Sequence, residues 1–399
     1  MSLDEKLLIA CDVHLLKAPD GSYWCDAIYD YNFWKRYMTV FPKLKIAGRC
    51  KNVDTVDPKW KRVDGYGIEI FEIPFYQGPV QLARNYRKIQ AKLKAVSFGC
   101  GAALLRMPSP TAQMVYKKLP KSMPVAGEIV YDPTDDVKRK DNSLFIHLIN
   151  RIISMQLESF CATANGVSYV TEKSIQSHYP SYARIHGEDK AHFETYYSTI
   201  TLSDDAFSGP RDYTGVKSLE LALSCVAMEN DRKGEKILIQ CVKLARERGY
   251  DVTAVLIGDG SKRKEFQKLA ERLEIQEYVK FTGLLSSSDA VRERLKKADV
   301  FVFPTQAEGL PRGILEAMAG GMPVLSTSVG GIPEILDERY MLDPFDAEAF
   351  ANAVCRMMDN PSELNEMSRR NFSVAEKYKN TILQERREQF YKKLKTLIE

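Results

Sequence analysis

The stretch "PTQAEGLPRGILEAMAGGMPVLSTSVGGIPEIL" contains near its start a pair of glutamates, Glu308 and Glu316, that have seven residues between them, and two glycine pairs follow in the same stretch. Carboxylates accept hydrogen bonds from the vicinal hydroxyls of a ribose, and glycines allow a backbone to approach a ligand closely. A simpler alternative is that the carboxylates only complement a helix dipole and the glycines only end helices. The elements around the stretch help to choose between these interpretations.

The stretch follows "DVFVFPT", an apolar run that predicts a buried strand. A helix is predicted over "PRGILEAMA", with Pro311 as its first residue. No Ser, Thr, Asp or Asn immediately precedes Pro311, so the first-turn N–H groups are left available to an anion such as a diphosphate. Glu316 lies about one turn further along. The pattern therefore favours a site for a nucleoside diphosphate joined to a polyhydroxylated group.

The second half of the chain alternates strand and helix patterns with short connections. The runs "LELALSCVAM", "DVTAVLIGDG" and "YVKFTG" read as strands, and "GEKILIQCVKLARERGY" and "SKRKEFQKLAERLEI" read as amphipathic helices. This alternation predicts a parallel sheet covered on both faces. Such sheets bind ligands beyond the carboxyl ends of their strands.

The first half shows the same alternation less regularly, with "KLLIACDV" as a strand, "CDAIYDYNFWKRYMTVF" as a helix and "KLKIAGRC" as a strand. We therefore predict an α/β chain with two Rossmann-like, doubly wound domains, over residues 1–205 and 219–376. The polar residues 206–218 contain Gly and Pro and read as a linker. The amphipathic C-terminal segment, 377–399, is expected to pack back on the first domain as a helix.

Composition narrows the class of protein. A chain of 399 residues with 44% hydrophobic and 28% charged residues is typical of a globular protein of two domains. No apolar run has transmembrane length, and the first residues lack the features of a secretory signal. Eight scattered cysteines indicate reduced thiols and a cytosolic protein. The net charge of +4 has no dense basic run, which argues against nucleic acid as a partner.

The motif "EGLPRGILEAMAGGMPV" closely resembles the Glu-x7-Glu motif of the retaining glycosyltransferases of family 4. Those enzymes have the GT-B fold, in which two Rossmann-like domains face a cleft. The resemblance also takes in "RKG" (232–234), "VLIGDG" (255–260), "VKFTGLL" (279–285) and "ADVFVFPT" (298–305), in the family's order. It covers the second domain, whereas the first domain is similar in architecture alone.

The resemblance implies a role for each matching residue of the second domain. Glu316 would bind the ribose hydroxyls, Glu308 would contact the transferred sugar, and Lys233 would pair with the diphosphate. Further donor-binding positions are Gly309, Leu310 and Pro311 beside the sugar and phosphates, Gly258 in "VLIGDG", and Phe281 in "VKFTG", whose backbone would read the base. These enzymes need no catalytic metal and no cofactor, and the sequence has no Asp-x-Asp placed like a metal site.

One position departs from the family. Its members usually carry an arginine five residues before the lysine that binds the diphosphate, and Met228 stands there in this chain. Methionine cannot neutralise phosphate, so we predict that another arginine compensates. Arg312 is the first choice because it follows Pro311 at the predicted helix start. Arg232 is the second, and the alternative is that Arg312 is a plain surface residue.

The first domain offers weaker candidates for the acceptor side. Arg106, Glu128 and Asp132 end predicted strands and are placed to face a ligand, and His14 ends the first strand. Gly21 in "PDGSYW" resembles the family's glycine loop near the acceptor, and Asp20-Gly21 is equally a plain turn signal. The other histidines read as structural or surface residues: His147, His178, His186 and His192.

The predicted activity is transfer of a hexosyl or N-acetylhexosaminyl group, with retention, from a nucleotide diphosphate sugar to a glycan or lipid-linked acceptor. Family habit suggests cell-envelope polysaccharide synthesis, in the cytoplasm. The positive excess of the first domain favours an anionic or membrane-borne acceptor, with peripheral contact to the inner face of the membrane. One predicted helix carries the cations for that contact, or else only a solvated face: Arg84, Arg87, Lys88, Lys92 and Lys94. The alternatives are a nucleotide-sugar epimerase on the same fold and a non-catalytic nucleotide-sugar binder.

Overall fold

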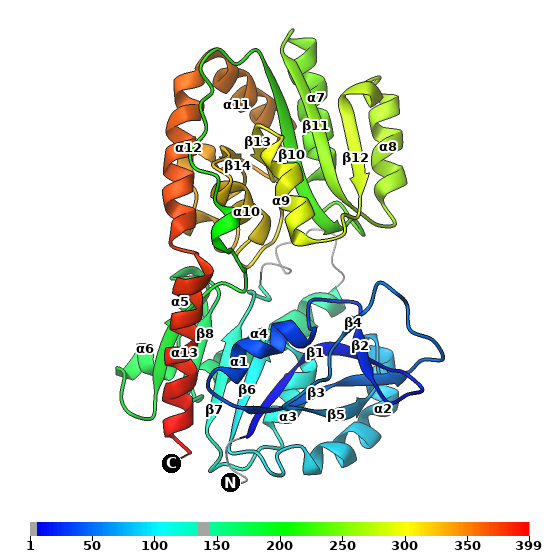
Figure 1. Cartoon of the computed structure of the whole chain (residues 1–399), viewed down its shortest axis with the longest axis vertical. Coiled ribbons are helices and arrows are strands. Elements are labelled where there is room, and N and C mark those ends of the chain that lie inside the picture. Colours follow the sequence, from blue (N-terminus) through cyan, green and yellow to red (C-terminus); the bar gives the residue numbers. More distant parts are fainter. Residues whose placement is uncertain (1–5, 135–143, 399) are drawn as a thin grey trace. The chain divides into compact units, whose positions relative to one another are not determined.

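The computed structural model describes residues 6–134 and 144–398 and divides the chain into two compact units (Figure 1). The first unit contains residues 1–197 together with residues 384–399, and the second unit contains residues 198–383. The chain thus leaves the first unit, builds the second, and returns to the first with its last helix, α13 (Asn380–Thr396).

The first unit is built on a sheet whose parallel strands follow the order β5-β3-β1-β6-β7-β8-β9. These strands are β1 (Lys6–Lys17), β3 (Lys43–Asn52), β5 (Ile68–Pro74), β6 (Ala102–Met107), β7 (Val125–Ile129), β8 (Gly166–Tyr169) and β9 (Phe193–Tyr196). The short strand β2 (Tyr23–Cys25) pairs antiparallel with the end of β1, and β4 (Lys61–Arg62) pairs with β2. Every residue of β6 and β7 is buried, as expected for parallel strands covered on both faces.

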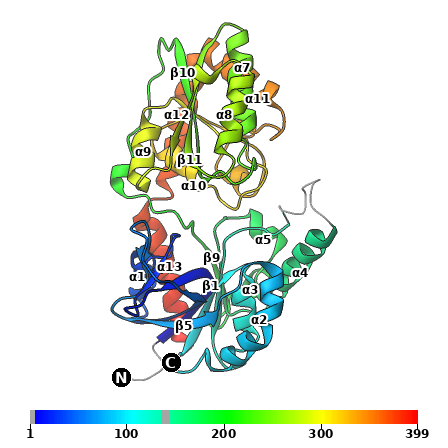
Figure 2. The same ribbon diagram turned by 90° about the vertical axis from the view of Figure 1, so that its right-hand side faces the viewer.

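Helices cover both faces of this sheet, with α2, α3 and α4 on one side and α1 and α13 on the other (Figure 2). The helices of the first unit before α13 are α1 (Tyr31–Met38), α2 (Gly78–Lys92), α3 (Pro110–Tyr116), α4 (Leu144–Cys161), α5 (Ser174–His178) and α6 (Tyr182–His186). The sequence prediction of a helix starting at Cys25 is wrong, because that residue ends β2. The helix begins after Asp30, whose carboxylate accepts a hydrogen bond from the N–H of Phe33.

The second unit has a parallel sheet of order β12-β11-β10-β13-β14. Its strands are β10 (Ser218–Ala227), β11 (Asp251–Asp259), β12 (Val279–Gly283), β13 (Val300–Val302) and β14 (Val324–Leu325). Its helices are α7 (Glu235–Glu247), α8 (Arg263–Arg272), α9 (Ser288–Lys296), α10 (Arg312–Ala319), α11 (Ala347–Asp359) and α12 (Pro361–Glu376). Chain order reverses at β10, so the switch point of the sheet lies between β10 and β13.

The segment predicted as a linker, residues 206–218, is part of the second unit. The Arg211 Nε donates to the carbonyl of Gly320 at 2.7 Å, and the buried Tyr213 hydroxyl donates to the carbonyl of Asp299 at 2.7 Å. A polar composition with Gly and Pro is typical of linkers. It also suits a segment attached through hydrogen bonds instead of apolar packing, and the sequence does not separate the two cases.

The structure describes the state of the cysteines and the apolar character of the helices. All eight cysteines lie in the described residues as free thiols, and all but Cys50 are buried. Within residues 6–134 and 144–398, no helix is both long enough and apolar enough to cross a bilayer.

Candidate functional site

Lys233 and Glu308 meet at the switch point of the second sheet. Lys233 follows β10 and Glu308 follows β13, and these two strands are neighbours in the sheet. The Lys233 ammonium forms an ion pair with the Glu308 carboxylate, and both side chains are partly exposed. The carboxyl edge at a switch point is where open α/β sheets bind ligands. Two residues predicted to bind one ligand, 75 positions apart in sequence, therefore lie together at that edge.

Backbone hydrogen bonds fix the loops that carry this pair. The carbonyl of Arg232 accepts from the N–H of Gln306 at 2.9 Å and from the Thr305 hydroxyl at 3.3 Å. The Lys233 ammonium also lies 5.6 Å from the centre of the Phe303 ring, in cation–π range. The loop after β10 and the loop after β13 are thus attached to each other as well as to the sheet.

The second glycine-rich turn supports the loop of Glu308. The N–H of Gly331 donates to the carbonyl of Gly309 at 2.6 Å. Gly330 has a φ of +56°, and a Cβ atom added there would lie 1.9 Å from the carbonyl oxygen of Glu308. A side chain at position 330 would therefore displace the loop that carries the carboxylate, which gives this glycine a structural reason.

Glu316 lies in α10, which begins one residue later than predicted. Pro311 is the N-cap, not the first helical residue, and its carbonyl accepts the first helical bond from the N–H of Leu315 at 3.4 Å. No side chain caps this helix start. Burial raises the pKa of Glu316, and the positive charges of Arg312 and Arg292 oppose that shift. The second of these arginines, Arg292, lies 4.0 Å from Glu316 and was not anticipated from the sequence.

The other donor-side candidates lie on the same edge. Gly309, Leu310 and Gly258 are buried, whereas Arg312 is exposed in the first turn of α10. Phe281 is partly exposed in β12, and its carbonyl accepts from Arg263 at 3.4 Å. Met228, at the position of the missing arginine, has a fully buried side chain. Compensation by Arg312 or Arg232 stays a prediction.

Residues 221–360 match the protein family described as "Glycosyl transferases group 1". The matched range contains Lys233, Glu308 and Glu316. The second unit is a group 1 glycosyl transferase domain.

Three known proteins are similar to this chain over different lengths. Protein CapJ from Staphylococcus aureus is 24% identical over 354 residues, which cover 88% of this chain and 86% of CapJ. The amylovoran biosynthesis glycosyltransferase AmsK from Erwinia amylovora is 25% identical over 153 residues, 36% of this chain and 37% of AmsK. The structure of Anabaena HepE in complex with UDP covers 96% of this chain and 98% of HepE, with a TM-score of 0.63 and 14% identity. The likeness to HepE extends over both units, and the chain has the GT-B fold.

One buried residue of the glycosyl transferase domain, Glu235, was not singled out from the sequence. Glu235 opens α7 directly after Gly234 and is fully buried, and neither carboxylate oxygen has a hydrogen-bond partner among the described residues. Burial raises the pKa of Glu235, with Cys225 and Lys233 nearby opposing the shift. A glutamate in a first helical turn is favoured by the dipole and reads as ordinary in sequence.

We expect Glu235→Gln to stabilise the protein at neutral pH. A carboxyl whose pKa is raised on folding is ionised more readily in the unfolded chain, so its cost to stability grows as pH rises above the unfolded pKa of about 4.3. Urea unfolding should show little difference from the parent near pH 4 and a clear gain near pH 8. The exposed Glu271→Gln on α8 is the matched control, and an equal gain at both pH values would contradict the assignment.

In the first unit, the structure contradicts the ligand-facing prediction for Arg106 and Glu128. Both side chains are about 5% exposed and form an ion pair with each other inside the unit. The Glu128 carboxylate also accepts from the hydroxyls of Tyr37 (3.0 Å), Tyr197 (3.0 Å) and Tyr391 (2.8 Å). Burial alone would raise the pKa of Glu128, but Arg106 and these hydroxyls hold it below its usual value. These residues are a buried polar network.

Asp132 is also buried and satisfied. Its carboxylate accepts from Thr134, from the Tyr179 hydroxyl at 2.8 Å, and lies 2.6 Å from the Nδ1 of His178. The ring of His178 is 52% exposed. The prediction that His178 is a surface residue therefore missed its pairing with a carboxylate 46 positions away, for which the sequence carries no signal.

Gly21 and His14 remain as candidates of the first unit. Gly21 has a φ of +85° in the turn between β1 and β2, where its N–H donates to the carbonyl of Ala18 at 3.0 Å, as in a plain turn. His14 is partly buried in β1 and meets the edge of Phe75, and burial lowers its pKa. Gly21 has no side chain and contributes only its backbone to this turn, and His14 stays a candidate.

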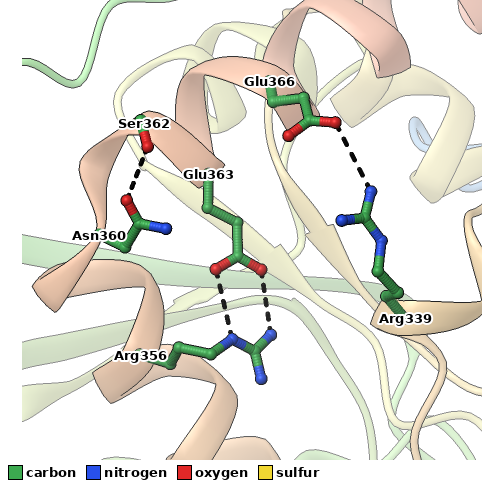
Figure 3. Close-up of a pocket in the computed structure, with 6 residues that line it drawn as sticks. All are labelled: Arg339, Arg356, Asn360, Ser362, Glu363 and Glu366. Carbon is green, nitrogen blue, oxygen red and sulfur yellow. Dashed lines mark hydrogen bonds and ion pairs between the residues drawn. The ribbon is translucent and has the colours of Figure 1, made fainter.

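A separate polar pocket of about 460 Å³ lies between α11 and α12 in the second unit (Figure 3). Its lining residues are Arg339, Arg356, Asn360, Ser362, Glu363 and Glu366. Arg356 forms two hydrogen bonds with Glu363, at 3.1 and 3.3 Å, and Arg339 pairs with Glu366 at 3.6 Å. The two arginines and the two glutamates of this pocket neutralise one another's charge. The pocket contains none of the predicted site residues.

Proposed function

We propose that this protein is a retaining glycosyltransferase that moves a sugar from a nucleotide diphosphate sugar to a saccharide or lipid-linked acceptor in cell-envelope polysaccharide synthesis. The observation that carries the proposal is the Lys233–Glu308 pair at the switch point, beside a helix start without a side-chain cap. AmsK, named for amylovoran biosynthesis, and HepE, which binds UDP in its structure, support a sugar polymer and a nucleotide as the substrates.

In this proposal, each group of the site either stabilises negative charge on the diphosphate or holds the donor in position. Lys233 and the first-turn N–H groups of α10 stabilise the diphosphate as negative charge develops on its leaving oxygen. Glu308 accepts hydrogen bonds from hydroxyls of the transferred sugar and orients its anomeric carbon. Glu316 accepts from the ribose hydroxyls. The first unit holds the acceptor, and retention and independence from metals remain predictions.

Nucleotide binding tests the donor site. A panel of nucleoside diphosphates and nucleotide sugars, screened by thermal shift, should identify a ligand that raises the melting temperature. Calorimetry with that ligand should then show that Glu316→Ala loses about 1–3 kcal/mol of binding free energy, since the ribose hydroxyls lose a charged acceptor. Glu338→Ala, an exposed carboxylate of the same unit, is the matched control.

Unchanged affinity in the Glu316 variant would remove the ribose role. Product analysis with and without a saccharide acceptor separates transfer from the two alternatives. An epimerase would change the nucleotide sugar without an acceptor, and a non-catalytic binder would leave it intact in both cases.

A further inference from the structure

An apolar groove of about 260 Å³ lies in the first unit between α2, the start of α3 and α4. Six of the residues that line it are apolar: Pro79, Leu82, Pro108, Pro110, Ile149 and Ile153. Polar side chains are few in its lining, and α2, α3 and α4 lie on the same face of the sheet (Figure 2). The groove belongs to the first unit alone and contains none of the residues predicted to bind the donor.

Exposed apolar side chains continue this groove onto the surface. On α4, Leu148, Ile152 and Met155 are 57%, 46% and 61% exposed, and their spacing places them along one stripe of the helix. Val80 at the start of α2 is 63% exposed. Single exposed apolar residues are ordinary, but a stripe that adjoins an apolar groove marks a surface that another apolar phase covers.

The exposed side of α2 carries cations and no acidic residue. Residues 78–100 contain no Asp or Glu, and α2 carries Arg84, Arg87 and Lys88 in exposed positions. None of these three forms an ion pair within the described part of the chain. Arg151 adds an exposed cation on α4. The surface therefore combines apolar side chains with a net positive charge.

We propose that α2 and α4 dock the first unit on the surface of an anionic lipid bilayer. Exposed Leu148, Ile152 and Met155 enter the boundary between headgroups and acyl chains, and the cations of α2 contact the lipid phosphates. A second copy of the chain fits this surface poorly, because it would bring two positive helices together. Docking needs no nucleotide, so only its use, the delivery of a lipid-linked acceptor, rests on the proposed function.

Co-sedimentation of the full chain with vesicles tests the proposal. The parent protein should sediment with vesicles of phosphatidylcholine mixed with phosphatidylglycerol, and less so at high salt. The variant Arg84→Gln/Arg87→Gln/Lys88→Gln should lose about five-fold in partitioning for each cation removed. The variant Leu148→Ser/Met155→Ser should lose binding to the mixed vesicles and any residual binding to phosphatidylcholine alone.

Matched controls lie in the second unit. Lys264→Gln/Lys268→Gln/Arg272→Gln removes three exposed cations from α8, and Leu284→Ser/Phe345→Ser removes two exposed apolar side chains. Both should sediment like the parent, and circular dichroism should show every variant folded. The proposal is overturned if the parent stays in solution at low salt, or if the controls lose as much as the α2 and α4 variants. Dimerisation of the parent that the α4 variant abolishes, without vesicle binding, would assign the surface to a second copy.

Discussion

Glu308→Gln is expected to abolish sugar transfer while leaving the fold and nucleotide affinity near those of the parent. The side chain is partly exposed at the carboxyl edge of the second sheet, and its ion-pair partner is Lys233. Glutamine keeps the size but removes the charge that the proposed mechanism places beside the reacting sugar. Loss of one such electrostatic contact costs roughly a hundred-fold or more in turnover. Initial rates with a nucleotide sugar and an acceptor measure the effect.

Two controls separate a catalytic role from a structural one. The melting temperature of the Glu308 variant should match the parent, because its loop is fixed by the backbone bond between Gly331 and Gly309. Its affinity for the nucleoside diphosphate should also change little, since Lys233 and the start of α10 remain. Turnover close to that of the parent would remove Glu308 from the mechanism.

Glu128→Ala should destabilise the first unit by about 3–5 kcal/mol, the usual result of breaking a buried ion pair from one side. The change leaves the Arg106 guanidinium buried without its carboxylate, and it leaves the hydroxyls of Tyr37, Tyr197 and Tyr391 without their acceptor. Urea unfolding followed by the fluorescence of Trp34, which is fully buried in the first unit, measures the loss.

The double variant Arg106→Met/Glu128→Gln is the matched control for this prediction. Methionine removes the unpaired charge, and the glutamine oxygen still accepts hydrogen bonds from the hydroxyls of Tyr197 and Tyr391. The double variant should recover most of the stability that the single variant Glu128→Ala loses, because the single variant keeps Arg106 as a buried charge without a partner. Stability of the single variant equal to that of the parent would show that the network contributes little. Because folding lowers the pKa of Glu128, its contribution is present above the unfolded pKa and disappears as pH falls through the folded value.

The sequence predicts the second unit well for a physical reason. Its strands are buried on both faces and read as continuous apolar runs, and its site residues follow strand ends directly along the chain. Chain order therefore nearly determines that Lys233 and Glu308 share an edge. The small error at Pro311 concerns the end of a helix, where a proline fits either of two adjacent positions.

The polar residues of the first unit are harder to predict because their partners are remote in sequence. A charged residue near a strand end reads the same whether it faces a ligand or a buried partner. The hydrogen-bond donors of Glu128 come from β6, α1, the end of β9 and α13. No local sequence pattern indicates that these elements contact one another at Glu128. Glu235 was missed for the opposite reason, because its position at a helix start looks ordinary.

The return of α13 to the first unit also sets the order of events during synthesis. Glu128 and the Tyr391 hydroxyl that it accepts from are 263 residues apart, with the second unit between them. At about 5–20 residues per second, a ribosome takes roughly 13–50 s to make the intervening chain. The second unit receives its last residue before the first unit receives most of α13. The nascent first unit therefore lacks one hydrogen-bond donor of its buried polar network until Tyr391 is made.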